Sequence, residues 1–193
     1  MIQTLYRKLL GSLRSQFDIR EPFSVAGMKF NGFGEYRATA QRYVLSKRAA
    51  LWEASTQEFA FVKLLPHLTL KELRATISHI IAHFIGDLEL PANHMSTSVD
   101  LIFLTHSLSL EAETEIRKFN YRKSFKLGLQ GWVDMKVAAF DETGSSVSKA
   151  RHFPKAQSDV SKPSDQSRVI TNRHGQDLQP LLMSLITPQG SQS

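Results

Sequence analysis

The chain has 193 residues, 41% of them hydrophobic and 22% charged, which is typical of one folded globular domain rather than a disordered or collagen-like chain. It contains no cysteine, which excludes disulfides, thiolate nucleophiles and zinc–thiolate or iron–sulfur sites. Lysine and arginine number 24 against 18 aspartate and glutamate, a formal charge of +6 that permits an anionic partner without requiring one. No apolar run is long enough to span a membrane and no secretory signal is recognisable, so we expect a cytoplasmic protein with no membrane partner.

The first part of the chain changes from a helical pattern to a strand pattern. Apolar residues recur at helical spacing over Met1–Ser15, which predicts an amphipathic helix that docks on the following sheet rather than on a membrane. Strand patterns follow. Two β-rich runs, Arg42–Glu53 and Glu58–Leu65, flank the polar segment 54–57, so we expect a hairpin with its turn there.

The remaining elements alternate between helices and strands. Thr69 and Glu72 have the spacing of a capping box ahead of a helix over 70–88, and Ser109 is placed to cap a short helix. Strands are predicted at 98–105, 124–129, 133–141 and 168–171, and a last helix at 178–186. Seven serines and two prolines without periodicity predict a disordered insertion over 142–167, and 187–193 is expected to be a disordered tail. This order favours a single α/β (or α+β) domain over 1–186, with a mixed sheet flanked by helices.

Two histidines have the spacing of paired metal ligands. His79 and His83 are four residues apart in the predicted helix 70–88, but at about 100° per residue they lie opposite its apolar stripe, on the expected solvent face. No glutamate stands between them, and a third ligand such as His94 would have to come from another element. We therefore expect no metal and no other cofactor.

Asp134 and Lys136 are the strongest catalytic candidates. At positions i and i+2 of a strand their side chains share one face, as in the Asp-x-Lys element of metal-dependent nucleases, for which Mg²⁺ or Mn²⁺ would be the cofactor. Such a site needs a second acid on the neighbouring strand, and the preceding strand run at 125–130 supplies none. The alternative, which we favour, is the polar face of a half-buried strand.

The densest basic segment, Arg117–Lys126, interleaves five basic side chains with two phenylalanines and a tyrosine; the basic residues are Arg117, Lys118, Arg122, Lys123 and Lys126. This pattern is typical of surfaces that contact phosphates while aromatic rings stack on bases, so nucleic acid is the partner that the segment indicates. The alternative is local, because basic residues favour a helix C-terminus and the aromatic residues complete the core.

Several fragments together resemble a family of uncharacterised bacterial proteins, found mainly in Gram-positive anaerobes and defined only as a domain of unknown function. The fragments are Tyr43–Lys47 with Leu51 and Trp52; Asn93–Thr97; Lys123–Phe125 with Gly128, Gly131 and Trp132; and Val169–Asn172 with Gly175. The resemblance covers 17–185, implies only a short turn in place of 142–167, and implies no catalytic residue.

The element order is also similar to the restriction-endonuclease-like core. That likeness would place the runs 42–53 and 58–65 on the strands that bear the active site, but no acid pairs with an acid-x-lysine element there, which implies an inactive or repurposed relative. Phosphate-binding loops, dinucleotide fingerprints and nucleophile elbows do not occur either. We therefore favour a non-enzymatic binding or interaction module that contacts nucleic acid through its basic segment. The alternative is a metal-dependent, nuclease-like enzyme using Asp134 and Lys136.

Overall fold

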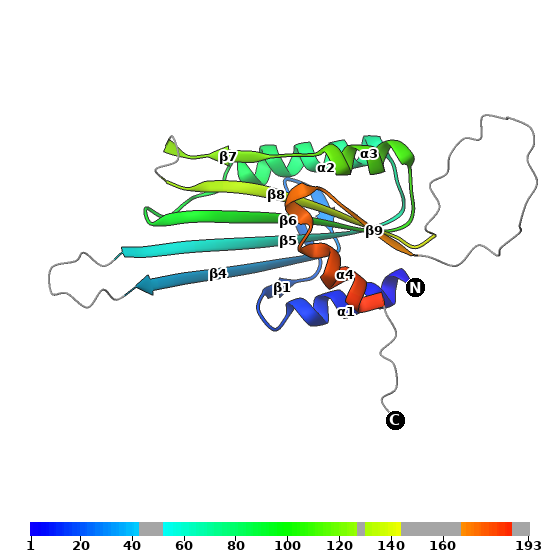
Figure 1. Ribbon diagram of the computed structural model, residues 1–193, viewed down its shortest axis with the longest axis horizontal. Coiled ribbons are helices and arrows are strands. Elements are labelled where there is room, and N and C mark those ends of the chain that lie inside the picture. The colour runs from blue at the N-terminus through cyan, green and yellow to red at the C-terminus, as the bar shows by residue number, and fades with distance from the viewer. Residues whose placement is uncertain (43–51, 127–129, 144–166, 187–193) are drawn as a thin grey trace, which may run out of the picture.

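The computed structural model describes residues 1–42, 52–126, 130–143 and 167–186, and in them one mixed sheet forms the centre of the molecule (Figure 1). Its strands run in the order β1-β4-β5-β6-β8-β7, and β9 also pairs with β8. The strands are β1 (Asp18–Arg20), β4 (Gly32–Arg42), β5 (Trp52–Leu68), β6 (His94–Leu108), β7 (Arg122–Ser124), β8 (Trp132–Asp141) and β9 (Arg168–Thr171). A separate hairpin consists of β2 (Phe23–Val25) and β3 (Met28–Phe30).

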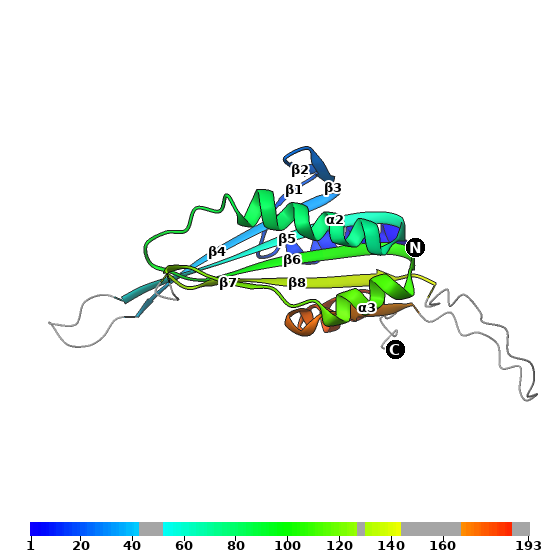
Figure 2. The same ribbon diagram turned by 90° about the horizontal axis from the view of Figure 1, so that it is seen from above.

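Three neighbouring strands, β5, β6 and β8, are parallel, and the helices between them pack on one face of the sheet. These helices are α2 (Leu70–Ile80), which continues as a π-helical segment (Ile81–Ile85), and α3 (Leu110–Lys118). The opposite face carries α1 (Ile2–Leu13) and α4 (Leu178–Ile186), as the two views together show (Figures 1 and 2). The predicted single α/β domain with a mixed sheet flanked by helices is therefore confirmed.

Side-chain alternation along the central strands builds a core on each face. On β5, Phe59 and Phe61 face α2, whereas Ala60 and Val62 face α1. All four residues of Leu101–Leu104 on β6 are buried, because helices cover both sides of the strand at this point. The predicted docking of the N-terminal helix is also confirmed, since Leu5 and Leu9 are part of the α1-side core.

The predicted hairpin turn at 54–57 is wrong. These residues lie inside β5, whose partner β4 ends at Arg42, and the connection 43–51 lies outside the described residues. The polar residues of this segment have another cause: Thr56 and Gln57 line a hollow in the sheet, and Ser55 and Gln57 are buried.

The strand predicted at 124–129 is also misplaced. The strand β7 ends at Ser124, and Lys126 has a positive φ of 46°, which is a turn conformation rather than an extended one. The predicted helix caps are confirmed: Thr69 and Glu72 form both bonds of the capping box, and Ser109 accepts from the backbone N–H of Ala112. Most of the predicted insertion 142–167, and the tail 187–193, lie outside the described residues.

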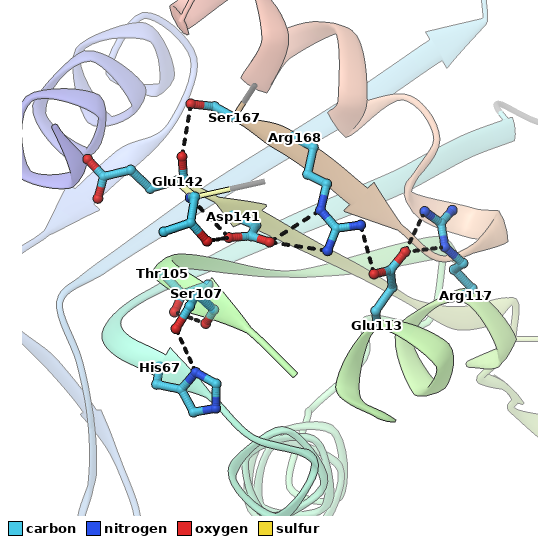
Figure 3. A network of polar contacts seen from close by, with 10 residues as sticks. His67, Thr105, Ser107, Glu113, Arg117, Asp141, Glu142, Ser167 and Arg168 are labelled. Atoms are coloured by element: carbon cyan, nitrogen blue, oxygen red, sulfur yellow. Dashed lines mark hydrogen bonds and ion pairs between the residues drawn. The ribbon is translucent and has the colours of Figure 1, made fainter. Parts of the chain in front are cut away.

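A buried ion network holds the far end of β8. Asp141, which has no exposed surface, accepts hydrogen bonds from Arg168 on β9 and from the backbone and hydroxyl of Thr143 (Figure 3). Arg168 also pairs with Glu113 of α3 at 2.8 Å, and Glu113 pairs with Arg117. This network joins β8, β9 and α3. No helix in the described residues is long and apolar enough to cross a membrane.

Candidate functional site

A row of polar side chains crosses three strands on the α1 side of the sheet. In the strand register, Glu58 of β5 is opposite Ser98 of β6, and Ser98 is opposite Asp134 of β8. Two residues further along, Asp100 of β6 is opposite Lys136 of β8. Residues two apart on a strand point to the same face, so all five side chains lie on one surface. The helices α1 and α4 cover only the other half of this face, the right-hand half in Figure 1.

Four of these five residues, all except Asp100, line a hollow of about 330 Å³, which we call the polar hollow. Hydroxyl, carboxyl, ammonium and aromatic groups all contribute to its wall, which is formed by Tyr36, Thr56, Gln57, Glu58, Ser96, Thr97, Ser98, Trp132, Asp134, Lys136 and His174. The volume is that of a small-molecule site, for which roughly 300–1,000 Å³ is usual.

Lys136 is the centre of the charged groups. Its Nζ lies 2.7 Å from Asp177, the residue just before α4, and 3.5 and 3.7 Å from Glu58 and Asp100. The Asp100 side chain is only 3% exposed, whereas that of Glu58 is 32% exposed. Ser98 donates a hydrogen bond of 2.6 Å to Asp100.

Burial and the Glu58 carboxyl together raise the pKa of Asp100, against the opposing effect of Lys136 and Ser98. A second carboxyl group nearby disfavours the ionised form of a buried carboxyl, so the Glu58 charge adds to the effect of burial on Asp100. Burial opposes the charge of Lys136, but the carboxylates of Asp100, Asp177 and Glu58 outweigh it and raise the pKa of the ammonium group. The cluster therefore combines an ammonium group that stays charged with a buried carboxyl group, Asp100, whose pKa is raised.

Asp134 has its own partner. Arg122 of β7 donates two hydrogen bonds to its carboxylate, at 2.6 and 2.7 Å, and the guanidinium lies 5.5 Å from the centre of the Trp132 ring. Both oxygens of Asp134 are occupied in this way. Asp134 and Lys136 do share one face, as their spacing predicts, but they belong to different ion pairs.

The second acid that an Asp-x-Lys element needs is present on the neighbouring strand. It is Asp100, which the sequence pattern does not single out, because the pairing of β6 with β8 joins segments far apart in the chain. One signal was available: Asp100 is the only charged residue within the otherwise apolar buried run that starts at Val99 and ends at Leu104.

The described residues contain no group of three or more histidine, aspartate or glutamate side chains arranged to hold a metal ion. The rings of His79 and His83 lie 4.6 Å apart, and His79 hydrogen-bonds the carbonyl oxygen of Val25 at 2.7 Å. His83 is exposed, as predicted, whereas His79 is only partly exposed because it contacts the β2–β3 hairpin. His94 is buried and hydrogen-bonds the backbone carbonyl of Gln130, whereas Ser96 lines the polar hollow.

The structure distributes the basic segment over two faces. Arg117 pairs with Glu113 on α3, and Arg122 points to the polar hollow with Asp134. The ammonium of Lys123 lies 5.0 Å from the centre of the Phe125 ring, which packs against the core on the α2 side. Lys118 and Lys126 are exposed.

The fold and the polar hollow define an α/β domain that carries a ligand-sized hollow on one face of a mixed sheet. A family model described as "Domain of unknown function (DUF8052)" matches residues 2–162, and the chain therefore belongs to that family. The expected membership of a domain-of-unknown-function family is thus confirmed, with the match starting at α1 rather than at residue 17. No curated protein and no solved structure matches the chain.

Proposed function

We propose that this protein is a cytoplasmic binding module, and that its ligand is a small polar molecule held in the polar hollow. The observation that carries the proposal is the position of Lys136: a half-buried ammonium at the centre of three carboxyl groups, on the wall of a ligand-sized hollow. Perturbed titratable groups in a hollow are typical of binding and catalytic sites. Hydroxyls of Thr56, Ser96 and Ser98 add donors and acceptors that fix the orientation of a polar ligand.

The test is a binding screen by ¹H–¹⁵N NMR with amino acids, monosaccharides and polyamines as the probes. We expect at least one probe to shift the amides of Thr56, Ser98 and Trp132 together, and Lys136→Met to weaken its binding by about tenfold, the loss of roughly one hydrogen bond to a charged group. The matched control is Lys118→Met, which removes an exposed ammonium outside the hollow. If no probe shifts these amides, or if the two variants bind alike, the polar hollow is not the binding site.

Nucleic acid is the second candidate ligand, through the basic segment. Its support is that Lys118, Lys123 and Lys126 form no ion pair with a carboxylate within the described residues, so their charges are available to phosphates. Binding to a DNA or RNA oligonucleotide is expected to weaken steeply with salt, and Lys123→Ala with Lys126→Ala is expected to lower the salt slope by about 2. Arg117→Ala is the control, because Glu113 already pairs with that guanidinium. A slope unchanged by the lysine variants would overturn this candidate.

A metal-dependent, nuclease-like enzyme is the alternative, supported by Asp100 as an acid beside the Asp-x-Lys element. In that case Asp100 and Asp134 would hold Mg²⁺ or Mn²⁺ and Lys136 would stabilise the phosphoryl transition state. Arg122 would have to release Asp134 first. Cleavage of DNA or RNA with either cation, abolished by Asp134→Ala and by Asp100→Asn, would favour the enzyme over the binding module.

A further inference from the structure

A second hollow lies next to the polar hollow, on the same face of the sheet, and Glu58 lines both. It has a volume of about 290 Å³ and is bounded by the end of α1, by α4 and by the sheet. Its apolar wall includes Leu13, Phe17, Ile102 and Leu181. We call it the α1/α4 hollow.

The wall of the α1/α4 hollow contains two charged residues, which lie close to each other. Among the described residues that line it, Glu58 and Asp100 are the charged ones, and Lys136, which touches both, lines the polar hollow instead. A ligand in the α1/α4 hollow therefore meets these apolar side chains, the polar residues Ser12, Ser15 and Gln16 at the end of α1, and the carboxyl groups of Glu58 and Asp100. One ammonium group, that of Lys136, faces three carboxyl groups: its Nζ lies 2.7 Å from Asp177, 3.5 Å from Glu58 and 3.7 Å from Asp100. The last of these distances is longer than a hydrogen bond.

We propose that the α1/α4 hollow binds a primary amine with a small apolar body, its ammonium group held by Glu58 and Asp100. An ammonium group carries three donors and no acceptor, which matches a pair of carboxyl oxygens, while the apolar wall removes the hydrocarbon part from water. A divalent cation would leave the apolar part of this wall unused, because its ligands are oxygen atoms, whereas an amine with a hydrocarbon body contacts both parts. This inference rests on the proposed function only in that both assign small-molecule binding to this face of the sheet.

Proton release is the distinguishing property of such a site. Burial and the Glu58 carboxyl raise the pKa of Asp100, so a proton competes with the ammonium group for this carboxylate. A bound ammonium stabilises the ionised form of Asp100 and lowers its pKa, so protons are released on binding. Binding therefore tightens as the pH rises, until the amine itself loses its charge.

The experiment compares hexylamine with hexan-1-ol as probes, using methyl NMR of Leu13, Ile102 and Leu181 and calorimetry in two buffers of different ionisation enthalpy. We expect hexylamine to bind about tenfold more tightly than the alcohol, to shift these methyl groups, and to release protons on binding. Asp100→Asn is expected to abolish the proton release. The double variant Glu58→Gln with Asp100→Asn is expected to bind the amine and the alcohol equally.

Glu111→Gln is the matched control: it converts an exposed carboxylate of α3, one that lines neither hollow, into an amide. It should keep both the proton release and the preference for the amine. Equal binding of amine and alcohol to the unmodified protein, or a preference that survives the double variant, overturns the inference whether or not the variants fold well. Shifts confined to Thr56, Ser98 and Trp132 would overturn this inference and support binding in the polar hollow. The absence of shifts in both hollows would count against both proposals.

Discussion

Two buried aspartates on adjacent parallel strands have opposite surroundings. Asp141, at the end of β8, has both oxygens engaged, one by the guanidinium of Arg168 and the other by Thr143 (Figure 3). Asp100, on β6, has Ser98 as a hydrogen-bond donor, a carboxyl group beside it and Lys136 at 3.7 Å. Both are almost completely buried.

This difference between the two aspartates distinguishes a structural ion pair from a candidate binding site. The charge of Asp141 is neutralised by Arg168, which Glu113 also holds in position. A ligand is therefore not needed to compensate the buried carboxylate. At Asp100 burial is not fully compensated, which is why the pKa of its carboxyl is raised. Any partner that supplies positive charge would therefore stabilise the ionised form of Asp100.

The largest effect is expected at the structural pair. Arg168→Met leaves the Asp141 carboxylate buried without its cation, and should lower the free energy of unfolding in urea by about 3–5 kcal/mol. The control is Arg74→Met, whose ion pair with Glu115 lies on the surface and should contribute little. If Arg168→Met lowered the free energy of unfolding no more than Arg74→Met does, the ion pair of Asp141 would not be the structural contact that we describe.

A smaller loss is expected when the cation of the polar hollow is removed. Lys136→Met should cost about 2 kcal/mol, less than at Arg168, because Asp100, whose pKa is already raised, can respond by taking up a proton. Adding Asp100→Asn should restore most of the loss, since the variant removes a carboxyl that Lys136 compensates. A double-mutant cycle by urea denaturation measures this; strictly additive losses would contradict it.

The pH dependence of stability tests Asp100 by itself. Its pKa is raised on folding, so its contribution is fully present below the pKa of the unfolded chain and is lost as the pH rises through the pKa of the folded state. Asp100→Asn removes this dependence. The variant should gain on the unmodified protein by up to about 1.4 kcal/mol per pH unit in that interval. Unfolding curves at pH 5 and pH 8 check this, and parallel profiles for the two proteins would be the contrary result.

The smallest effect concerns the hydroxyl beside Asp100. Ser98→Ala removes the 2.6 Å hydrogen bond to the carboxyl group and should cost about 1 kcal/mol at pH 8, with a smaller cost at pH 5, where Asp100 is protonated. Ser96→Ala removes a hydroxyl from the same strand face and serves as the control. Equal losses for the two variants would show that Ser98 does not stabilise the ionised carboxylate.

Local patterns predicted much of this fold. The capping box at Thr69 and the doubly buried run Leu101–Leu104 could be read directly, because capping and burial on both faces leave their mark within a few residues. The segment 54–57 misled the same reasoning. Its polar residues line a hollow in the sheet or are buried, and a strand with such surroundings resembles a turn in sequence.

The candidate site could be predicted only in part. Periodicity places Asp134 and Lys136 on one strand face, since that relation is local. Glu58 and Asp100 join them only through the pairing of β5 with β6 and of β6 with β8, and two helices separate these strands in the chain. The sequence also could not show that Arg122 takes up Asp134, or that the basic segment divides between two faces.

The pairing of Asp141 with Arg168 has a practical consequence. They are opposite each other in the β8–β9 register, so the chain leaves the sheet and returns to it at one point. Lengthening a connection that begins and ends at a single cross-strand pair adds only about 0.6 kcal/mol for each doubling of its length. This position therefore suits the insertion of an affinity tag or a fluorescent domain. The strand β8, at whose end the reporter would be inserted, also carries Lys136, which lines the polar hollow.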